Sequence, residues 1–163
     1  MKLTDKLNNL QWVVDIIKSE DLALDFVQSL CGEWIGGGIH RETFAYNLDP
    51  KYVIKVETEN TGDNLNEWQI WNEVQGLTGD LAFVKDWLAP VKWISPNGRL
   101  LVMKRTTPHN WEGKKKLPEK VPAFLWDVKI DNFGWVGNKF MCHDYGQFYN
   151  FIHYTKRMNK AVW

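Results

Sequence analysis

Strand-like segments in this chain come in consecutive pairs, each joined by a short turn sequence. The predicted pairs cover residues 43–46 with 51–57, 88–95 with 99–104, and two short strands within 126–144. A helical pattern from about Asn64 to Leu77 separates the first pair from the second. Because there are more strands than a βαβ arrangement needs, we expect an α+β domain built on a predominantly antiparallel sheet.

The rest of the chain is expected to be helical at its ends and irregular in two places. Apolar residues at helical spacing predict helices after Thr4 and after Ser19. The cluster Gly36–Gly38 indicates a tight or flexible loop, and prolines and lysines between Thr106 and Val121 favour an extended loop. The segment 147–163, which alternates aromatic and polar residues, is predicted to be a C-terminal helix.

Composition restricts the classes of protein to which the chain can belong. With 163 residues, 44% of them apolar, it can build one core, in which ten tryptophans supply large rings. Zero net charge provides no global field for nucleic acid or membrane. Cys31 and Cys142 lie far apart without metal-type pairing. The N-terminal segment is polar and mixed in charge, so we expect no signal peptide or membrane span in it. We expect a cytoplasmic protein.

Residues whose side chains can act in catalysis or bind a metal ion cluster between Asp127 and Asp144. Asp127, Lys129 and Asn132 form a D-x-K-x-x-N element, and Asp144 opens a D-Y-G element after an apolar hairpin pattern. Phosphoryl transfer requires phosphates and metal to be held in line. Asp127 would receive or orient the proton of an attacking hydroxyl, and Lys129 would neutralise charge on the transferred group. The oxygens of Asn132 and Asp144 are the hard ligands that Mg²⁺ prefers.

A lysine in the strand at 51–57 supplies a second half of such a site. Lys55 and Val53 share one strand face, so Lys55 can bind phosphate oxygens while Val53 packs against a base. A partly buried lysine needs a carboxylate partner, and Glu67 and Glu73 on the next helix are both available. We prefer Glu67, because its helical face also carries apolar residues.

These motifs resemble the ATP-site lysine strand, catalytic loop and metal-binding D-F-G element of the protein-kinase-like superfamily. The chain is most similar to a truncated member of small phage or bacterial type. The resemblance implies ATP and Mg²⁺ as ligands. It also implies an N-lobe, an antiparallel sheet plus one inward helix, above a minimal C-lobe. We therefore expect a single domain over 1–163, divided into N-terminal helices (1–31), an N-lobe-like part (32–106) and a reduced catalytic part with the C-terminal helix (107–163).

Two further segments acquire roles from the same resemblance. The segment 38–44 resembles the phosphate-covering loop, so Gly38, Arg41 and Thr43 are expected to contact the nucleotide. The segment 100–106 resembles the fifth strand and hinge. This likeness implies that Met103 occupies the gatekeeper position and that Arg105 lies beside the adenine.

Departures from the family pattern leave two functions open. Leu125-Trp126 stands where the family has His-Arg, and only about twenty residues separate Thr106 from Asp127. The protein is either a kinase that transfers the γ-phosphate to a protein or small-molecule hydroxyl, or a pseudokinase-like binding or effector protein. A nucleic-acid module using Lys114–Lys116 and Trp111 is not expected, because the basic run is short and net charge is zero.

Overall fold

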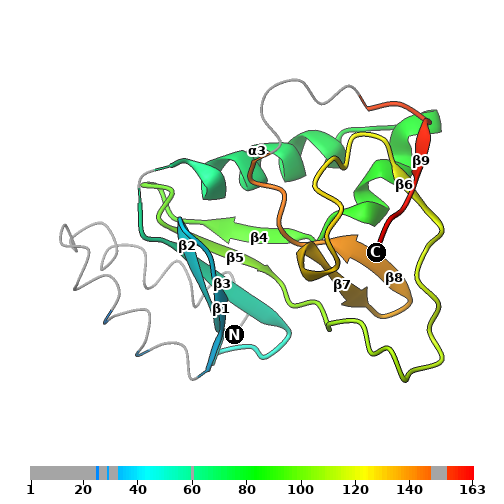
Figure 1. Ribbon diagram of the computed structural model, residues 1–163. Coiled ribbons are helices and arrows are strands. Elements are labelled where there is room, and N and C mark those ends of the chain that lie inside the picture. Colours follow the sequence, from blue (N-terminus) through cyan, green and yellow to red (C-terminus); the bar gives the residue numbers. More distant parts are fainter. Residues whose placement is uncertain (1–24, 26–28, 30–32, 60, 148–153) are drawn as a thin grey trace.

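A five-stranded antiparallel sheet, in the order β1-β2-β3-β5-β4, is the largest element of the protein (Figure 1). The computed structural model describes residues 25, 29, 33–59, 61–147 and 154–163. The strands of the sheet are β1 (Trp34–Gly37), β2 (Arg41–Ala45), β3 (Tyr52–Glu57), β4 (Val91–Ile94) and β5 (Leu100–Lys104). The predicted α+β class with an antiparallel sheet is confirmed.

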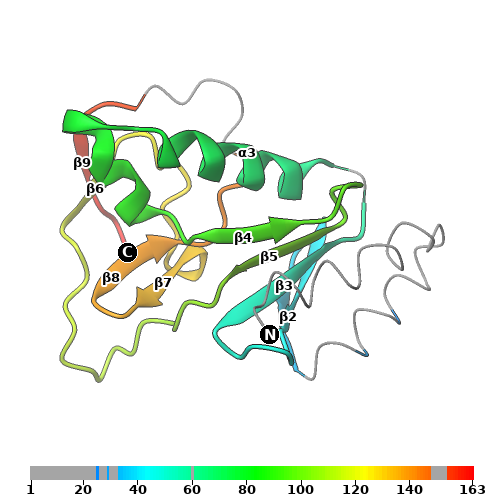
Figure 2. The same cartoon turned by 180° about the vertical axis from the view of Figure 1, so that it is seen from behind.

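Helix α3 (Asp63–Gln75) lies along one face of this sheet and packs against β3, β4 and β5 (Figures 1 and 2). Ile70 and Val74 of the helix join Val53, Leu101 and Met103 of the sheet in the main core. A second core covers the opposite face and contains Phe44, Tyr46, Ile54, Val56, Leu100 and Val102. Because side chains alternate along a strand, β3 points Val53 and Lys55 toward α3 and Ile54 away from it.

The start of α3 is held by a carboxylate from the end of β3. Glu57 accepts hydrogen bonds from the Thr61 hydroxyl at 2.8 Å, from the amide of Gly62, and from the amide of Asn64 at 3.3 Å. Gly62, with φ of 80°, supplies the left-handed turn that leads into the helix. A negative group at a helix N-terminus satisfies free amides and complements the helix dipole. Glu57 therefore fixes α3 against β3.

The remaining elements form a smaller layer beside the sheet. They are the 3₁₀ helices η1 (Gly79–Trp87) and η2 (Ile130–Asn132), the pair β6 (Lys120–Pro122) with β9 (Met158–Lys160), and the hairpin β7 (Phe133–Val136) with β8 (Lys139–Cys142). Gly137, with φ of 61°, occupies the turn of this hairpin. The Ala89 amide donates to the Cys142 carbonyl at 2.8 Å. This contact brings the loop that follows β8 next to the end of η1.

Two local predictions were wrong. Gly36 and Gly37 belong to the edge strand β1, where they pair with Thr43 and Glu42 of β2, so the expected glycine loop shrinks to residues 38–40. The predicted C-terminal helix is replaced, in residues 154–163, by strand β9, which pairs with β6. In both cases the partner strand supplies backbone hydrogen bonds that the local sequence does not indicate.

Some predictions fall on residues that the structure does not describe. The two predicted N-terminal helices lie in residues 1–31, which fall outside the described residues except for Asp25 and Ser29. The 3₁₀ helix η1 was not predicted. In the described part of the chain, no helix combines the length and apolar character that crossing a membrane requires.

Candidate functional site

A buried ion pair joins β3 to α3. Lys55 Nζ lies 2.8 Å from Oε1 and 3.0 Å from Oε2 of Glu67. Both side chains are almost fully buried, because Lys55 projects from the covered face of the sheet and Glu67 from the inner face of the helix. Of the two carboxylates considered as partners of Lys55, Glu67 makes the contact. Glu73 instead accepts a hydrogen bond from the Tyr154 hydroxyl at 3.3 Å.

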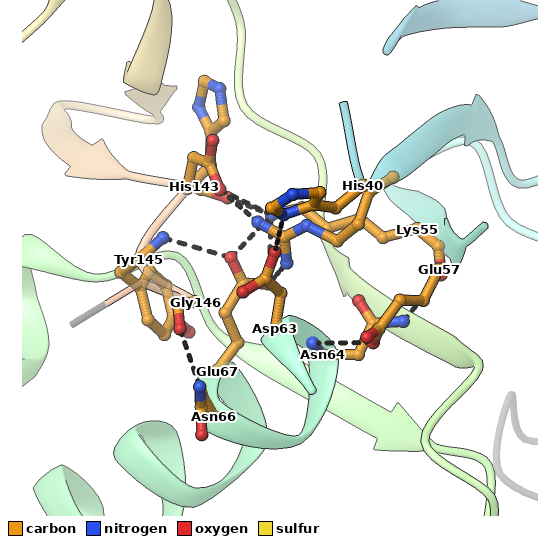
Figure 3. Close-up of polar contacts among 12 residues, drawn as sticks. His40, Lys55, Glu57, Asp63, Asn64, Asn66, Glu67, His143, Tyr145 and Gly146 are labelled. Atoms are coloured by element: carbon orange, nitrogen blue, oxygen red, sulfur yellow. Dashed lines mark hydrogen bonds and ion pairs between the residues drawn. The ribbon is translucent and has the colours of Figure 1, made fainter. Parts of the chain in front are cut away.

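Glu67 also binds two other parts of the chain, and its contact with Tyr145 can be followed in Figure 3. Its Oε1 accepts the backbone N–H of Tyr145 at 3.1 Å, and its Oε2 lies 3.0 Å from Nη1 of Arg41. A buried carboxylate requires this degree of compensation, because desolvation otherwise disfavours its charged form. Glu67 therefore ties β2, β3 and the loop after β8 to one point of α3.

Asp144 lies at the open side of this ion-pair cluster. Its Oδ1 forms an ion pair with Nη2 of Arg41 and lies 4.0 Å from Nζ of Lys55, while 47% of the side chain remains exposed. Partial burial raises the pKa of the Asp144 carboxyl, but the charges of Lys55 and Arg41 outweigh burial and lower the pKa below its usual value. Asp144 is therefore a carboxylate at neutral pH.

The pKa of Arg41 reflects the same cluster. Burial alone lowers the pKa of its guanidinium, whereas the charges of Glu67, Asp144 and Asp63 raise it by more, so the net change is upward. The side chain is only 10% exposed. Two cations and two carboxylates thus alternate in one chain of ion pairs, in the order Lys55, Glu67, Arg41 and Asp144.

The loop that carries Asp144 approaches α3 too closely for any side chain at position 146. A Cβ added to Gly146 would lie 2.6 Å from the backbone oxygen of Asp63. In addition, Asn66 Nδ2 donates to the Gly146 carbonyl at 3.0 Å. The glycine of the D-Y-G element is therefore required by the contact between this loop and the first turn of α3.

His143 contacts the ion-pair cluster through its backbone carbonyl. Lys55 Nζ donates to the His143 carbonyl, and the imidazole Nδ1 lies 2.9 Å from Oγ1 of Thr106. Burial, followed by the charge of Lys55, lowers the pKa of the imidazole to about 4. His143 is consequently neutral at physiological pH and adds no positive charge to the site.

The D-x-K-x-x-N residues form a second, more open cluster. Asn132 Nδ2 donates to Oδ2 of Asp127 at 2.9 Å, and Lys129 Nζ lies 3.0 Å from Oδ1 of Asp127. The side chain of Lys129 is 72% exposed and that of Asp127 is 31% exposed. The His143 amide donates to the Asn132 carbonyl at 2.8 Å, which connects this cluster to the Asp144 loop.

A cleft of about 680 Å³ lies between the sheet and these loops. Every residue predicted to contact a nucleotide lines it: Gly38, Arg41, Thr43, Val53, Lys55, Met103 and Arg105. The predicted metal ligands Asn132 and Asp144 line it as well. Among the described residues, Asp127 and Lys129 are not part of its wall. The structure therefore brings the expected binding residues together at the cleft. Of the four residues expected to take part in catalysis, Lys55 lines the cleft with Glu67 paired behind it, and Asp127 and Lys129 lie outside its wall.

The donor set suits a hard cation. The Asn132 amide group donates its N–H groups to Asp127, which leaves Oδ1 as the atom that can face a cation. Asp144 supplies an ionised carboxylate at the same cleft. No group of three or more His, Cys, Asp or Glu side chains in the described ranges is arranged to hold a metal ion. Mg²⁺ at Asn132 and Asp144 would therefore complete its coordination with phosphate oxygens and water.

Two contacts of the site were not predicted from the sequence. His40 Nδ1 lies 3.2 Å from Oδ2 of Asp63, which ties the turn between β1 and β2 to the first residue of α3. Arg41 was expected to contact phosphates, but not to bridge Glu67 and Asp144. The sequence signal for these contacts was the position of His40 and Arg41 shortly after the cluster Gly36–Gly38.

Comparisons of this chain with protein-family models, with curated proteins and with solved structures found no match.

Proposed function

We propose that the cleft binds ATP together with Mg²⁺, and that the protein is a small kinase-like phosphotransferase acting on the hydroxyl of a protein or small molecule. The observation that carries the proposal is the buried Lys55–Glu67 pair, which opens onto a cleft that Asn132 and Asp144 also line. A lysine held by a carboxylate in this way can bind phosphate oxygens at a fixed position.

The architecture around the pair supports the same function. A five-stranded antiparallel sheet with one helix between its third and fourth strands in sequence is the arrangement expected of such an N-lobe, and it supports the proposal. Val53 and Met103 contribute apolar surface to the cleft wall, where a base can pack. The D-Y-G element lies directly against α3 through Tyr145 and Gly146. Lys55, Asn132 and Asp144 come from three separately predicted motifs, and all three line this one cleft.

The proposed reaction needs few groups. The acceptor hydroxyl oxygen forms a bond to the γ-phosphorus, the bond from that phosphorus to the bridging oxygen breaks, and ADP leaves. Asp127 takes the hydroxyl proton, Lys129 neutralises charge on the transferred group, and Lys55 holds phosphate oxygens. When bound at Asn132 and Asp144, Mg²⁺ supplies further neutralisation of phosphate charge.

One observation favours a second candidate function. Asp127 and Lys129 contact each other at 3.0 Å and lie outside the cleft wall that the described residues form. A protein that binds nucleotide without transferring phosphate needs neither residue in the cleft. The second candidate is therefore a pseudokinase-like protein that binds nucleotide and acts through a partner.

Thermal melting tests the shared requirement of both candidates. Mg-ATP at about one hundred times its Kd adds roughly 2.7 kcal/mol of stability, which raises Tm by roughly 5–10 °C in a domain of this size. Asp144→Ala should remove the part of this increase that depends on Mg²⁺. Asp80→Ala, which changes an exposed carboxylate paired with Lys156, should keep it. No increase in wild-type Tm at millimolar nucleotide would contradict nucleotide binding.

Phosphate transfer distinguishes the two candidates. We expect release or transfer of the γ-phosphate by the wild type, and its loss in Asp127→Asn, with ATP binding retained in the variant. Asp80→Asn is the control, because Asp80 is an exposed carboxylate on η1 that does not line the cleft. Binding without any transfer in the wild type would leave the pseudokinase-like function.

A further inference from the structure

Arg41 holds the carboxylate that the proposed function assigns to the metal. One end of its guanidinium pairs with Asp144 Oδ1, and the other end lies 3.0 Å from Glu67 Oε2. Lys55, the other cation of the cluster, is 4.0 Å from Asp144. In this structure Arg41 therefore makes the closest contact with Asp144, and Lys55 supplies a second positive charge nearby.

The strand register explains why Arg41 reaches this position. Arg41 is the first residue of β2 and lies opposite Glu57 of β3, while Thr43 lies opposite Lys55. Because side chains at alternate positions share a face, Arg41 and Thr43 project on the same side of the sheet as Lys55. The turn at residues 38–40 precedes Arg41 directly, so its side chain lies at the rim of the cleft.

The two ends of the guanidinium are not equally enclosed. Glu67 has no exposed side-chain surface, and it is also bound by Lys55 and by the Tyr145 amide. The side chain of Asp144 is 47% exposed and lies in the cleft wall. The Arg41–Asp144 contact is therefore the end that an entering ligand meets first and can open with the smaller rearrangement.

A divalent cation at Asp144 would compete with the guanidinium of Arg41 for the same carboxylate. Both place positive charge beside one carboxylate in a partly buried site, where repulsion between like charges is weakly screened. Phosphate groups in the same cleft would offer the displaced guanidinium a new anionic partner in bidentate geometry.

We propose that Arg41 is the resident counter-ion of Asp144, and that the metal displaces it toward the phosphates of the nucleotide. This inference rests on the proposed nucleotide function and assigns Arg41 two successive partners. Its thermodynamic consequence is coupling: phosphates draw Arg41 away from Asp144 and so favour the metal, and the metal favours phosphate binding by Arg41 to the same extent.

Metal binding without nucleotide tests the first partner. Mn²⁺, a paramagnetic stand-in for Mg²⁺, is titrated into the full chain while free Mn²⁺ is followed by electron paramagnetic resonance. Arg41→Gln should bind Mn²⁺ about tenfold more tightly than the wild type, within the usual range of coupling between sites. Arg157→Gln, a change at an exposed arginine of the C-terminal segment, should match the wild type.

ATP binding in the presence of EDTA tests the second partner. Without metal, Arg41→Gln should bind ATP about tenfold more weakly than the wild type, because one phosphate-binding cation is lost. The two changes have opposite signs, whereas a misfolded variant would weaken the binding of both ligands. Arg41→Lys keeps the positive charge, but the lysine side chain cannot bridge Glu67 and Asp144 with two separate donor groups as arginine does. The Mn²⁺ affinity of this variant should therefore lie between those of the wild type and Arg41→Gln.

The outcomes separate this inference from the proposed function. If folded Arg41→Gln or Arg41→Lys binds Mn²⁺ no more tightly than the wild type, the counter-ion role is overturned, even where Mg-ATP raises the wild-type Tm. If the order of Mn²⁺ affinities is as expected but ATP does not bind to any form, the competition at Asp144 stands and the nucleotide function falls.

Discussion

At the scale of single residues, His143 shows how the site controls its charge. Its imidazole is buried against the Thr106 hydroxyl, and Lys55 Nζ donates to its backbone carbonyl, so a protonated ring would be both desolvated and repelled by the Lys55 charge. The depressed pKa keeps the ring neutral. Arg41 and Lys55 then remain the two cations that face Glu67 and Asp144.

The depressed pKa of His143 predicts that stability falls in mild acid. The folded-state pKa of about 4 lies below the ordinary value of 6.5, so the unfolded chain takes up the proton first as pH falls. The neutral ring makes its full contribution to the free energy of unfolding above pH 6.5. Between pH 6.5 and pH 4 this contribution falls by up to roughly 1.4 kcal/mol for each pH unit. Urea unfolding across this interval should give a shallower pH dependence for His143→Gln. Identical slopes for variant and wild type would contradict the prediction.

At the scale of secondary-structure elements, the site depends on how α3 is held. Glu57 caps the helix from the preceding strand, and Arg99 Nη1 donates to the Glu57 carbonyl at 3.0 Å. This end of α3 contacts the D-Y-G loop through Asp63 and Asn66. A shift of the first helical turn would therefore move Glu67 and Asp144 relative to Lys55.

Removing the Glu57 carboxylate should lower the stability of the protein, because the first turn of α3 loses its capping group. Glu57→Ala leaves the amides of Gly62 and Asn64 without their carboxylate, and we expect the free energy of unfolding to fall by about 2 kcal/mol. Chemical denaturation measures this change. Glu59→Ala, at an exposed position two residues later, should change it by less than about 0.5 kcal/mol. Equal effects of the two substitutions would exclude the capping role.

At the scale of the whole molecule, the C-terminal segment completes the layer that carries Asn132 and Asp144. The ring of Trp163 meets Phe133 and Phe140 edge-to-face at 5.2 and 5.3 Å, and its Nε1 donates to the Pro118 carbonyl at 2.8 Å. Strand β9 adds backbone pairing to β6. Segments far apart in sequence thereby support the hairpin from which the Asp144 loop extends.

Truncating this ring should destabilise the protein more than truncating an exposed tryptophan. Trp163→Ala removes two ring contacts and one hydrogen bond, and we expect a loss of about 2 kcal/mol in the free energy of unfolding. Trp126, whose side chain is 63% exposed, provides the matched control, for which the loss should be smaller. The two variants can be compared by far-ultraviolet circular dichroism, which reports mainly on backbone structure, during urea unfolding. A loss for Trp163→Ala no larger than for Trp126→Ala would show that the C-terminal segment does not hold this layer.

The sequence alone determined the antiparallel strand pairs, the position of α3 and the face of β3 that carries Lys55. These features follow from turn residues and from side-chain periodicity, which act over a few neighbouring residues. Glu67 was also preferred on this basis, since the apolar neighbours on its helical face indicated that it points inward.

Only the tertiary structure decided the other features. It placed Gly36 and Gly37 in an edge strand, made residues 158–160 a strand, and joined Arg41 to Asp144. Each of these outcomes depends on a partner distant in the chain, whose position is set by packing of the sheet, α3 and the β7–β8 hairpin. Local propensity is too weak to determine such pairings, because the free energy of a backbone ladder or a buried ion pair comes from the groups that meet in the folded chain.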